Sequence, residues 1–222
     1  MNQPKDRFGA LAQQERFSVS EAVGGPRGLA EAGIPGVFFV IVYTVVGRLQ
    51  PALWAAIGVA GLLAAVRLAR RESVRQAVSG LVVVAVCAFV AARSGQAEDF
   101  YLPGLWINAG YATVYSLTIA VRWPIIGVFV GPLLGEGLAW RRDPARLRAY
   151  QWTTLLWVIM FLLRITVQWP LYAAGLVAPL GAARLAMGLP LFALTAYLSW
   201  LILRRVPRAA HHPADERHSP AG

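Results

Sequence analysis

The sequence is poor in the residues that build most soluble active sites. It contains one cysteine, Cys87, and three histidines, all near the C-terminus at His211, His212 and His218. A single cysteine excludes an intramolecular disulfide and any zinc or redox motif built on several cysteines. The histidines lie too far along the chain to form a metal site in its apolar part. We therefore expect neither a metal ion nor a cofactor.

Charge is also scarce. Charged residues make up 14% of the 222 residues, about half the share of a typical soluble domain, whereas hydrophobic residues make up 57%. A soluble domain of this length needs more polar surface, because its outer shell must face water. Basic residues outnumber acidic ones by 21 to 11, which gives a net charge of +10. These values predict a membrane protein that has the lipid bilayer as a partner.

Apolar segments fill the chain between two polar ends. Residues 1–31 are predicted to form a polar cytoplasmic tail, 32–205 a helical membrane domain, and 206–222 a disordered cytoplasmic tail. A helix needs about 20 apolar residues to cross a bilayer, or about 17 when it is tilted or the bilayer is thin. Seven apolar segments lie in the central part, at 34–47, 51–66, 76–92, 105–121, 125–140, 152–174 and 186–203.

The fifth of these segments is unlike the others. Pro132 removes a backbone donor in its middle, and Glu136 is its only acidic residue. Gly127, Gly131 and Gly135 follow a spacing of four residues, which is typical of close approach between helix backbones in a membrane. The segment is therefore predicted to be re-entrant or interfacial rather than a crossing.

Arginine clusters support the same conclusion by their position. In membrane proteins, arginine and lysine beside the spans mark the cytoplasmic side, where they contact anionic lipid headgroups. The first cluster lies at residues 67–75 and the second at residues 141–148. Three apolar segments separate them, so the two clusters lie on the same side of the membrane only if one of these segments does not cross. We expect six transmembrane helices with both termini cytoplasmic. The arginines that determine this topology are Arg67, Arg70, Arg71, Arg75, Arg141, Arg142, Arg146, Arg148, Arg204 and Arg205.

A loop on the opposite, outer side is expected to carry Arg93, Glu98 and Asp99. Seven tryptophans, such as Trp54, Trp140 and Trp200, lie mostly near segment ends, which is typical of an aromatic belt at the membrane interface.

Arg164 is the most unusual residue of the apolar segments. Helical spacing places it on one face with Phe161 and Gln168. A charge near the bilayer centre costs about 2.5–3.5 kcal/mol on insertion scales, so Arg164 should face the protein and meet an acidic partner, either Glu136, Glu98 or Asp99. It either contacts an anionic substrate or forms a structural pair, or it extends to the interface beside Trp169.

Other polar residues leave similar alternatives. Glu136 either holds a cation or relays a proton, or it pairs with Arg141 and Arg142 at the headgroup boundary. Asn108 and Tyr111, with Tyr115, form a polar stripe that predicts interhelical hydrogen bonds, with a pore lining as the alternative.

Two functions receive no support from the residues. No histidine lies in the apolar part to act as a base, and no nucleophile motif or converging pair of carboxylates is present. We expect no catalytic residues. The arginines set topology and contact lipid, so no nucleic acid is expected.

A weak internal repeat with an offset of about 71–73 residues is also visible: Pro51 matches Pro124, Arg70 matches Arg141, and Arg93 matches Arg164. It arises either from a duplication, as in many transporters, or from chance.

Several motifs resemble those of an actinobacterial membrane family catalogued as a domain of unknown function. They are Gly24-Gly25-Pro26-Arg27-Gly28, Arg70-Arg71-Glu72-Ser73, Glu98-Asp99-Phe100-Tyr101-Leu102-Pro103-Gly104, Trp140-Arg141-Arg142-Asp143, Gln168-Trp169-Pro170 and Gly188-Leu189-Pro190. The resemblance covers about residues 23–205 and implies a polytopic architecture.

A looser outline is similar to the intracellular septation protein A family: Pro35, Phe38-Phe39 and Tyr43 in the first span, then an arginine-rich loop and a tyrosine-bearing span. That family's stretch matching 124–140 is thought not to cross, although here it is more apolar. The resemblance implies a non-enzymatic cell-membrane protein that supports envelope assembly or division through membrane-protein partners or a second copy of itself. The alternative is a small-solute or ion transporter or channel with Arg164 and Glu136 in the pathway.

Overall fold

The computed structural model of the chain describes residues 33–71, 74–133 and 137–205. Within these ranges every regular element is a helix, so the all-α prediction is confirmed for them. The two predicted tails and Glu136 lie outside the described residues.

The described residues form two compact units. Unit 1 takes residues up to Asn108 together with Arg164–Phe192, and unit 2 takes Ala109–Leu163 and the residues from Ala193 onward. Three helices contribute residues to both units: α6 (Leu102–Ala120), α8 (Pro144–Ala173) and α10 (Leu189–Arg204).

Unit 1 begins with a short helix, α3 (Ile34–Val46). Proline suits its first turn because the missing N–H would have no partner there, and Pro35 occupies that turn. Gly47 ends the helix with a φ of 67°, a left-handed conformation that favours glycine, and its N–H donates to the Tyr43 carbonyl at 2.9 Å. At about 1.5 Å per residue, the 13 residues span about 20 Å.

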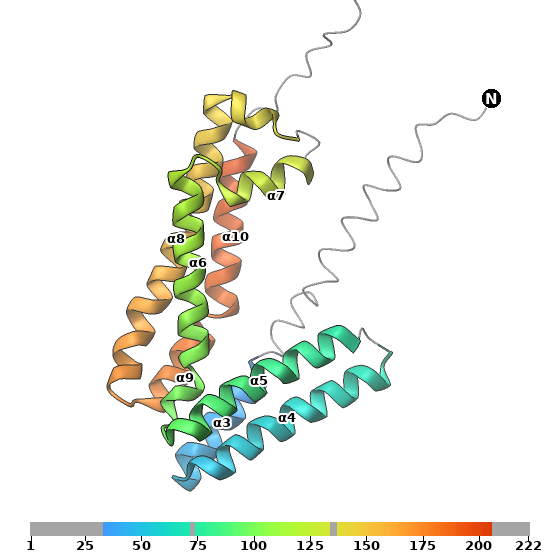
Figure 1. The fold of residues 1–222 in the computed structure, drawn as a ribbon, viewed down its shortest axis with the longest axis vertical. Helices are drawn as coiled ribbons and strands as arrows, with labels where there is room; N and C mark the ends of the chain where they lie inside the picture. The colour runs from blue at the N-terminus through green and yellow to red at the C-terminus, as the bar shows by residue number, and fades with distance from the viewer. Residues whose placement is uncertain (1–32, 72–73, 134–136, 206–222) are drawn as a thin grey trace, which may run out of the picture. The chain divides into compact units, whose positions relative to one another are not determined.

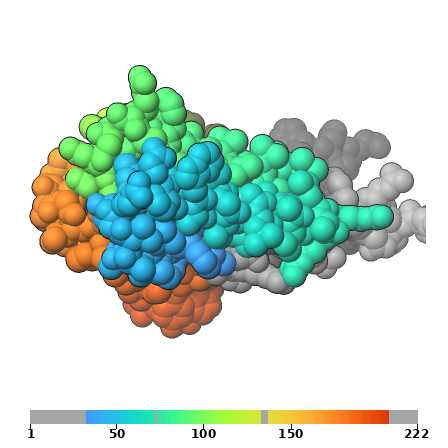
Figure 2. All heavy atoms as spheres, turned by 90° about the horizontal axis from the view of Figure 1, so that it is seen from below, coloured from blue at the N-terminus to red at the C-terminus, as the bar shows by residue number. Residues whose placement is uncertain are grey.

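The next helix, α4 (Leu49–Ala69), packs against both α3 and α5 (Val74–Ser94), and the three lie side by side in Figures 1 and 2. Small residues recur every four positions on α4, at Ala52, Ala56 and Ala60, and all three are buried. Small side chains let helix backbones approach closely, which is the main source of packing energy inside a membrane.

Aromatic rings close the core of unit 1. The ring of Phe39 stacks on Phe100 with centroids 4.2 Å apart, and Tyr101 packs edge-on against both rings. Phe100 ends the 3₁₀ turn η1 (Glu98–Phe100), which precedes α6. This contact fixes the polar turn at 98–101 against the apolar helices.

Unit 2 is organised around Trp140, whose side chain is fully buried. It lies on the 3₁₀ turn η2 (Ala139–Arg142) and packs edge-on against Tyr150 of α8 with centroids 5.3 Å apart. The helix α7 (Ile125–Leu133) presents Gly127 and Gly131 to the indole, because a Cβ at either position would lie 3.1 or 2.6 Å from it.

This arrangement corrects two predictions. Gly127 and Gly131 accommodate an indole ring rather than a helix backbone, and Gly135 lies outside the described residues. Trp140 is not part of an aromatic belt, whereas Trp54 and Trp200 are exposed as a belt requires.

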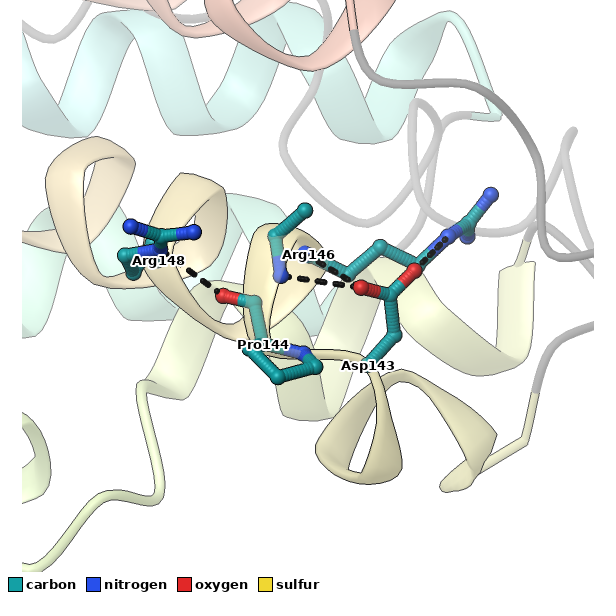
Figure 3. Close-up of polar contacts among 5 residues, drawn as sticks. Asp143, Pro144, Arg146 and Arg148 are labelled. Atoms are coloured by element: carbon teal, nitrogen blue, oxygen red, sulfur yellow. Dashed lines mark hydrogen bonds and ion pairs between the residues drawn. The ribbon is translucent and has the colours of Figure 1, made fainter.

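Asp143 sets the start of α8 (Figure 3). Its carboxylate accepts the Ala145 N–H at 2.8 Å and lies 3.7 Å from the Arg146 guanidinium, while Pro144 occupies the first helical position. A carboxylate is favourable at this end of a helix because the backbone N–H groups there lack partners. Arg146 is only 4% exposed, so it packs inside unit 2 rather than facing headgroups as predicted.

In the described part of the chain, four helical stretches are long and apolar enough to cross a membrane. A fifth exists only if α6 and α7, which are bent by 79° relative to one another, count as one broken span. The six predicted crossings are not confirmed, because α3 is shorter than the ~30 Å apolar core of a bilayer. The bend between α6 and α7 agrees with the prediction that the segment containing α7 is not an ordinary transmembrane span. The stretches that qualify alone are Leu49–Ala69, Ala77–Ser94, Pro144–Ala173 and Val177–Arg204.

Large apolar side chains cover the outside of these helices. Val45, Trp54, Phe89 and Phe129 are among the most exposed. Exposed apolar surface on this scale marks a protein that contacts lipid or other proteins.

The possible internal repeat would match helices of different length. Pro51 lies in a helix of 21 residues, whereas its match Pro124 precedes one of 9 residues. The pairing therefore does not correspond to equivalent helices.

Prediction: Gly131→Ala lowers the melting temperature of the purified protein in detergent. The new methyl group would overlap Trp140 and the Gly137 carbonyl, and overpacking of this kind costs about 1–3 kcal/mol. Gly110→Ala is the control, because its Cβ would meet nothing within 4 Å and alanine favours a helix. Equal melting temperatures for the two variants would contradict the role given to Trp140.

Candidate functional site: a cationic cavity in unit 1

Arg164 lies half-buried on α8, and its partner is a backbone carbonyl. Its guanidinium donates to the Gly188 carbonyl at 2.8 Å, and its buried Nε has no acceptor among the described residues. The prediction that Arg164 pairs with a carboxylate is therefore wrong for two of the three candidates, Glu98 and Asp99. The third, Glu136, lies outside the described residues. Arg164 keeps a positive charge that no described carboxylate neutralises.

The Gly188 carbonyl lies directly before α10 and also accepts the Phe192 N–H at 3.2 Å. Helix α9 (Val177–Ala186) cannot continue, because Pro190 has no N–H to donate to the Ala186 carbonyl four residues earlier. A carbonyl oxygen has two lone pairs, so Gly188, in the break between α9 and α10, accepts from Arg164 as well as from Phe192.

A second arginine, Arg184, was expected in an outward-facing loop and was missed as a site residue, whereas the structure places it in the last turn of α9. Its guanidinium donates to the Tyr101 carbonyl at 3.3 Å and lies 5.4 Å from the centroid of the Tyr101 ring. A side chain at Gly104 would overlap this guanidinium, so glycine is required for the contact. The short apolar stretch 177–186, with Pro179 in its first turn, was the signal that a helix carries Arg184.

Both arginines line a cavity of about 330 Å³ inside unit 1. Its lining includes Cys87 and Tyr101, and no carboxylate of the described part of the chain belongs to it. Tyr101 is 2% exposed, and its hydroxyl has no hydrogen-bond partner among the described residues. Burial raises the pKa of this hydroxyl, so Tyr101 stays protonated and can donate a hydrogen bond at neutral pH.

The predicted outer loop is partly buried. Asp99 is 7% exposed and accepts a hydrogen bond from the Tyr172 hydroxyl at 2.5 Å. Glu98 is half-buried close to Gly175. Only Arg93, in the last turn of α5, has the exposed side chain expected of this loop. Asp99 thus serves as an internal partner between η1 and α8.

Gln168 faces the protein interior, as helical spacing predicts. It is 2% exposed, and its amide oxygen has no donor among the described residues. It lies one turn from Arg164 on α8 but does not line the cavity. Phe161 is buried as well.

The polar stripe on α6 does not form the predicted interhelical hydrogen bonds. Asn108 donates to the Gly104 carbonyl of its own helix at 2.8 Å. In unit 2, the rings of Tyr111 and Tyr115 pack against Phe161 with centroids 5.3 and 5.5 Å apart. The two tyrosines therefore contribute aromatic packing.

The other arginines that were predicted to contact lipid headgroups lie in different environments. Arg70, Arg71 and Arg75 are exposed at the end of the α4–α5 pair, as expected of a headgroup contact. Arg141 instead lies over the Trp123 ring, 4.0 Å from its centroid. Arg148 is exposed and donates to the Pro144 carbonyl at 3.2 Å.

The cavity combines guanidinium donors, a neutral hydroxyl and apolar walls, a composition suited to binding rather than to proton transfer. Within residues 33–71, 74–133 and 137–205, no group of three His, Cys, Asp or Glu side chains gathers as a metal site would require.

The helices and the buried charge together define the class: an α-helical protein with several helices apolar enough to cross a membrane. The chain belongs to the family described as "Protein of unknown function (DUF3159)", whose match covers residues 23–210. No curated protein and no solved structure matches the chain.

Prediction: Tyr172→Phe lowers the free energy of unfolding by about 1–3 kcal/mol, because it leaves the buried Asp99 carboxylate without this donor. Tyr197→Phe is the matched control, since the Tyr197 ring is exposed. Unfolding curves in detergent that shift equally for both variants would contradict a stabilising role for the Asp99–Tyr172 pair.

Proposed function

We propose that the chain is a non-enzymatic, multi-pass protein of the cell membrane that carries a small solute. The observation that supports this is Arg164, a charge on an apolar helix that lines a cavity and is bonded to a helix-end carbonyl. Ionisable residues in such helices are costly and usually mark a substrate or ion pathway.

The break between α9 and α10 adds to this proposal. Transporters commonly bind substrate where a membrane helix is interrupted, because the interruption frees backbone groups next to the site. Here the interruption lies at Gly188, which contacts Arg164 directly. Glu136 is retained as a candidate for the same pathway.

For the topology, we propose six crossings of the plasma membrane, with both termini cytoplasmic and α7 re-entrant or interfacial. The exposed arginines at the end of the α4–α5 pair favour a cytoplasmic position for that end. The proposal requires α3 to cross although it spans about 20 Å, and local thinning of the bilayer around a short helix makes this possible at modest cost.

A role in envelope assembly or division, through protein partners or a second copy, is the alternative and rests on the septation-family resemblance. Normal cell length, septum placement and envelope permeability after gene deletion would reject it.

Prediction: Arg164→Ala abolishes solute flux in proteoliposomes, whereas Arg93→Ala leaves it unchanged. Arg164 lines the cavity and Arg93 does not, although both are arginines of unit 1. Glu136→Gln is tested in parallel. Melting temperatures of the variants separate lost function from lost fold. A wild-type protein that moves no member of a broad solute panel, or unchanged flux in Arg164→Ala, would overturn the carrier proposal.

Prediction: in a Cys87→Ala background, single cysteines at exposed positions report the topology. Arg71→Cys is labelled by an impermeant maleimide only from the cytoplasmic side, and Arg93→Cys only from outside, because α5 separates them. Phe129→Cys tests α7. Labelling of this last position only from outside would contradict the re-entrant or interfacial placement.

A further inference from the structure

The cavity of unit 1 has an imbalance of charge. Two guanidiniums, from Arg164 and Arg184, line it, whereas none of its described lining residues carries a carboxylate. The nearby acid Asp99 is engaged by the Tyr172 hydroxyl and is not part of the lining. Two cations beside one apolar cavity are unfavourable unless an anion joins them, because the surroundings screen charge poorly.

We propose that this cavity binds a small oxyanion, a carboxylate or a phosphate, through Arg164, Arg184 and Tyr101. This inference deepens the proposed function and rests on the same site. The three groups supply the donors that oxyanion oxygens require, and guanidiniums match carboxylate and phosphate geometry especially well.

Unused donors support the assignment. Among the described residues, neither the buried Nε of Arg164 nor the buried Tyr101 hydroxyl has a hydrogen-bond partner. Buried polar atoms are nearly always hydrogen-bonded in proteins, so two such atoms at one cavity indicate a missing acceptor. Backbone carbonyls hold the two arginines in place, since Gly188 accepts from Arg164 and Tyr101 accepts from Arg184. These contacts orient the guanidiniums without neutralising them.

The dimensions and walls of the cavity limit the ligand. A volume of about 330 Å³ is near the lower end of small-molecule sites, which range over about 300–1,000 Å³. Val84, Phe100 and Leu189 provide apolar lining beside the arginines. The occupant is therefore an anionic group with a short apolar part, which is either a soluble organic acid or phosphate, or the headgroup region of an anionic lipid.

Purified full-length protein distinguishes the two sources. In neutral phosphatidylcholine nanodiscs, acetate, propionate and inorganic phosphate are titrated while the melting temperature is recorded. A second arm compares neutral discs with discs containing phosphatidylglycerol, without added soluble anion. A rise in melting temperature in the first arm identifies a soluble anion, and a rise in the second alone identifies a lipid headgroup.

Variants locate the effect. Arg184→Gln and Arg164→Lys should weaken anion binding by about tenfold or more, the change expected from losing a charge-assisted hydrogen bond. Tyr101→Phe removes only the hydroxyl and should weaken binding less. Arg93→Gln removes one positive charge outside the cavity and should bind as the wild type does. As a second readout, the bound anion should slow alkylation of Cys87, which lines the cavity.

Two results would overturn the inference: no stabilisation in either arm, or equal stabilisation of the wild type, Arg184→Gln and Arg164→Lys. Binding without flux would reject the carrier proposal while supporting the oxyanion site. Flux that survives in Arg184→Gln with unchanged affinity would reject the oxyanion site while supporting a carrier.

Discussion

The hydrogen bond from Arg164 to the Gly188 carbonyl is the contact on which the rest of unit 1 depends. Arg164 carries a full positive charge on a helix long and apolar enough to cross a membrane. The hydrogen bond holds this charge at the break between α9 and α10. A carbonyl carries only a partial charge, so this contact satisfies a donor without cancelling the cation. The charge remains available to a ligand.

The surrounding residues follow from this constraint. Pro190 favours the break between α9 and α10 in which Gly188 lies, and Gly104 leaves the space in which Arg184 reaches Tyr101. The Tyr172 hydroxyl donates to Asp99, an acid that does not line the cavity. Stacked rings at Phe39 and Phe100 hold the η1 turn against α3. Local features of the sequence thus combine into a cationic cavity with apolar walls.

The sequence predicts much of the fold and less of the site. Apolar runs located most of the helices, but the prediction missed α9, and α8 begins at Pro144, where Asp143 caps it in a polar stretch. The helical periodicity correctly predicted that Gln168 faces the protein interior, because spacing along one helix is a local property. The partners of Arg164 and Asp99 lie 24 and 73 residues away, and no local pattern specifies contacts of that separation. The number of crossings stays a prediction, because α3 has the composition of a membrane helix but only 13 residues, and composition alone does not determine whether so short a helix crosses.

The most direct test of the central claim is an anomalous difference map from crystals of the full chain soaked in selenate, an oxyanion with a strong selenium signal. We predict a peak between Arg164 and Arg184, with an oxyanion oxygen within about 3 Å of the Arg164 Nε. A carboxylate side chain from Asp99, Glu136 or another residue bonded to Arg164 at that position would contradict the account.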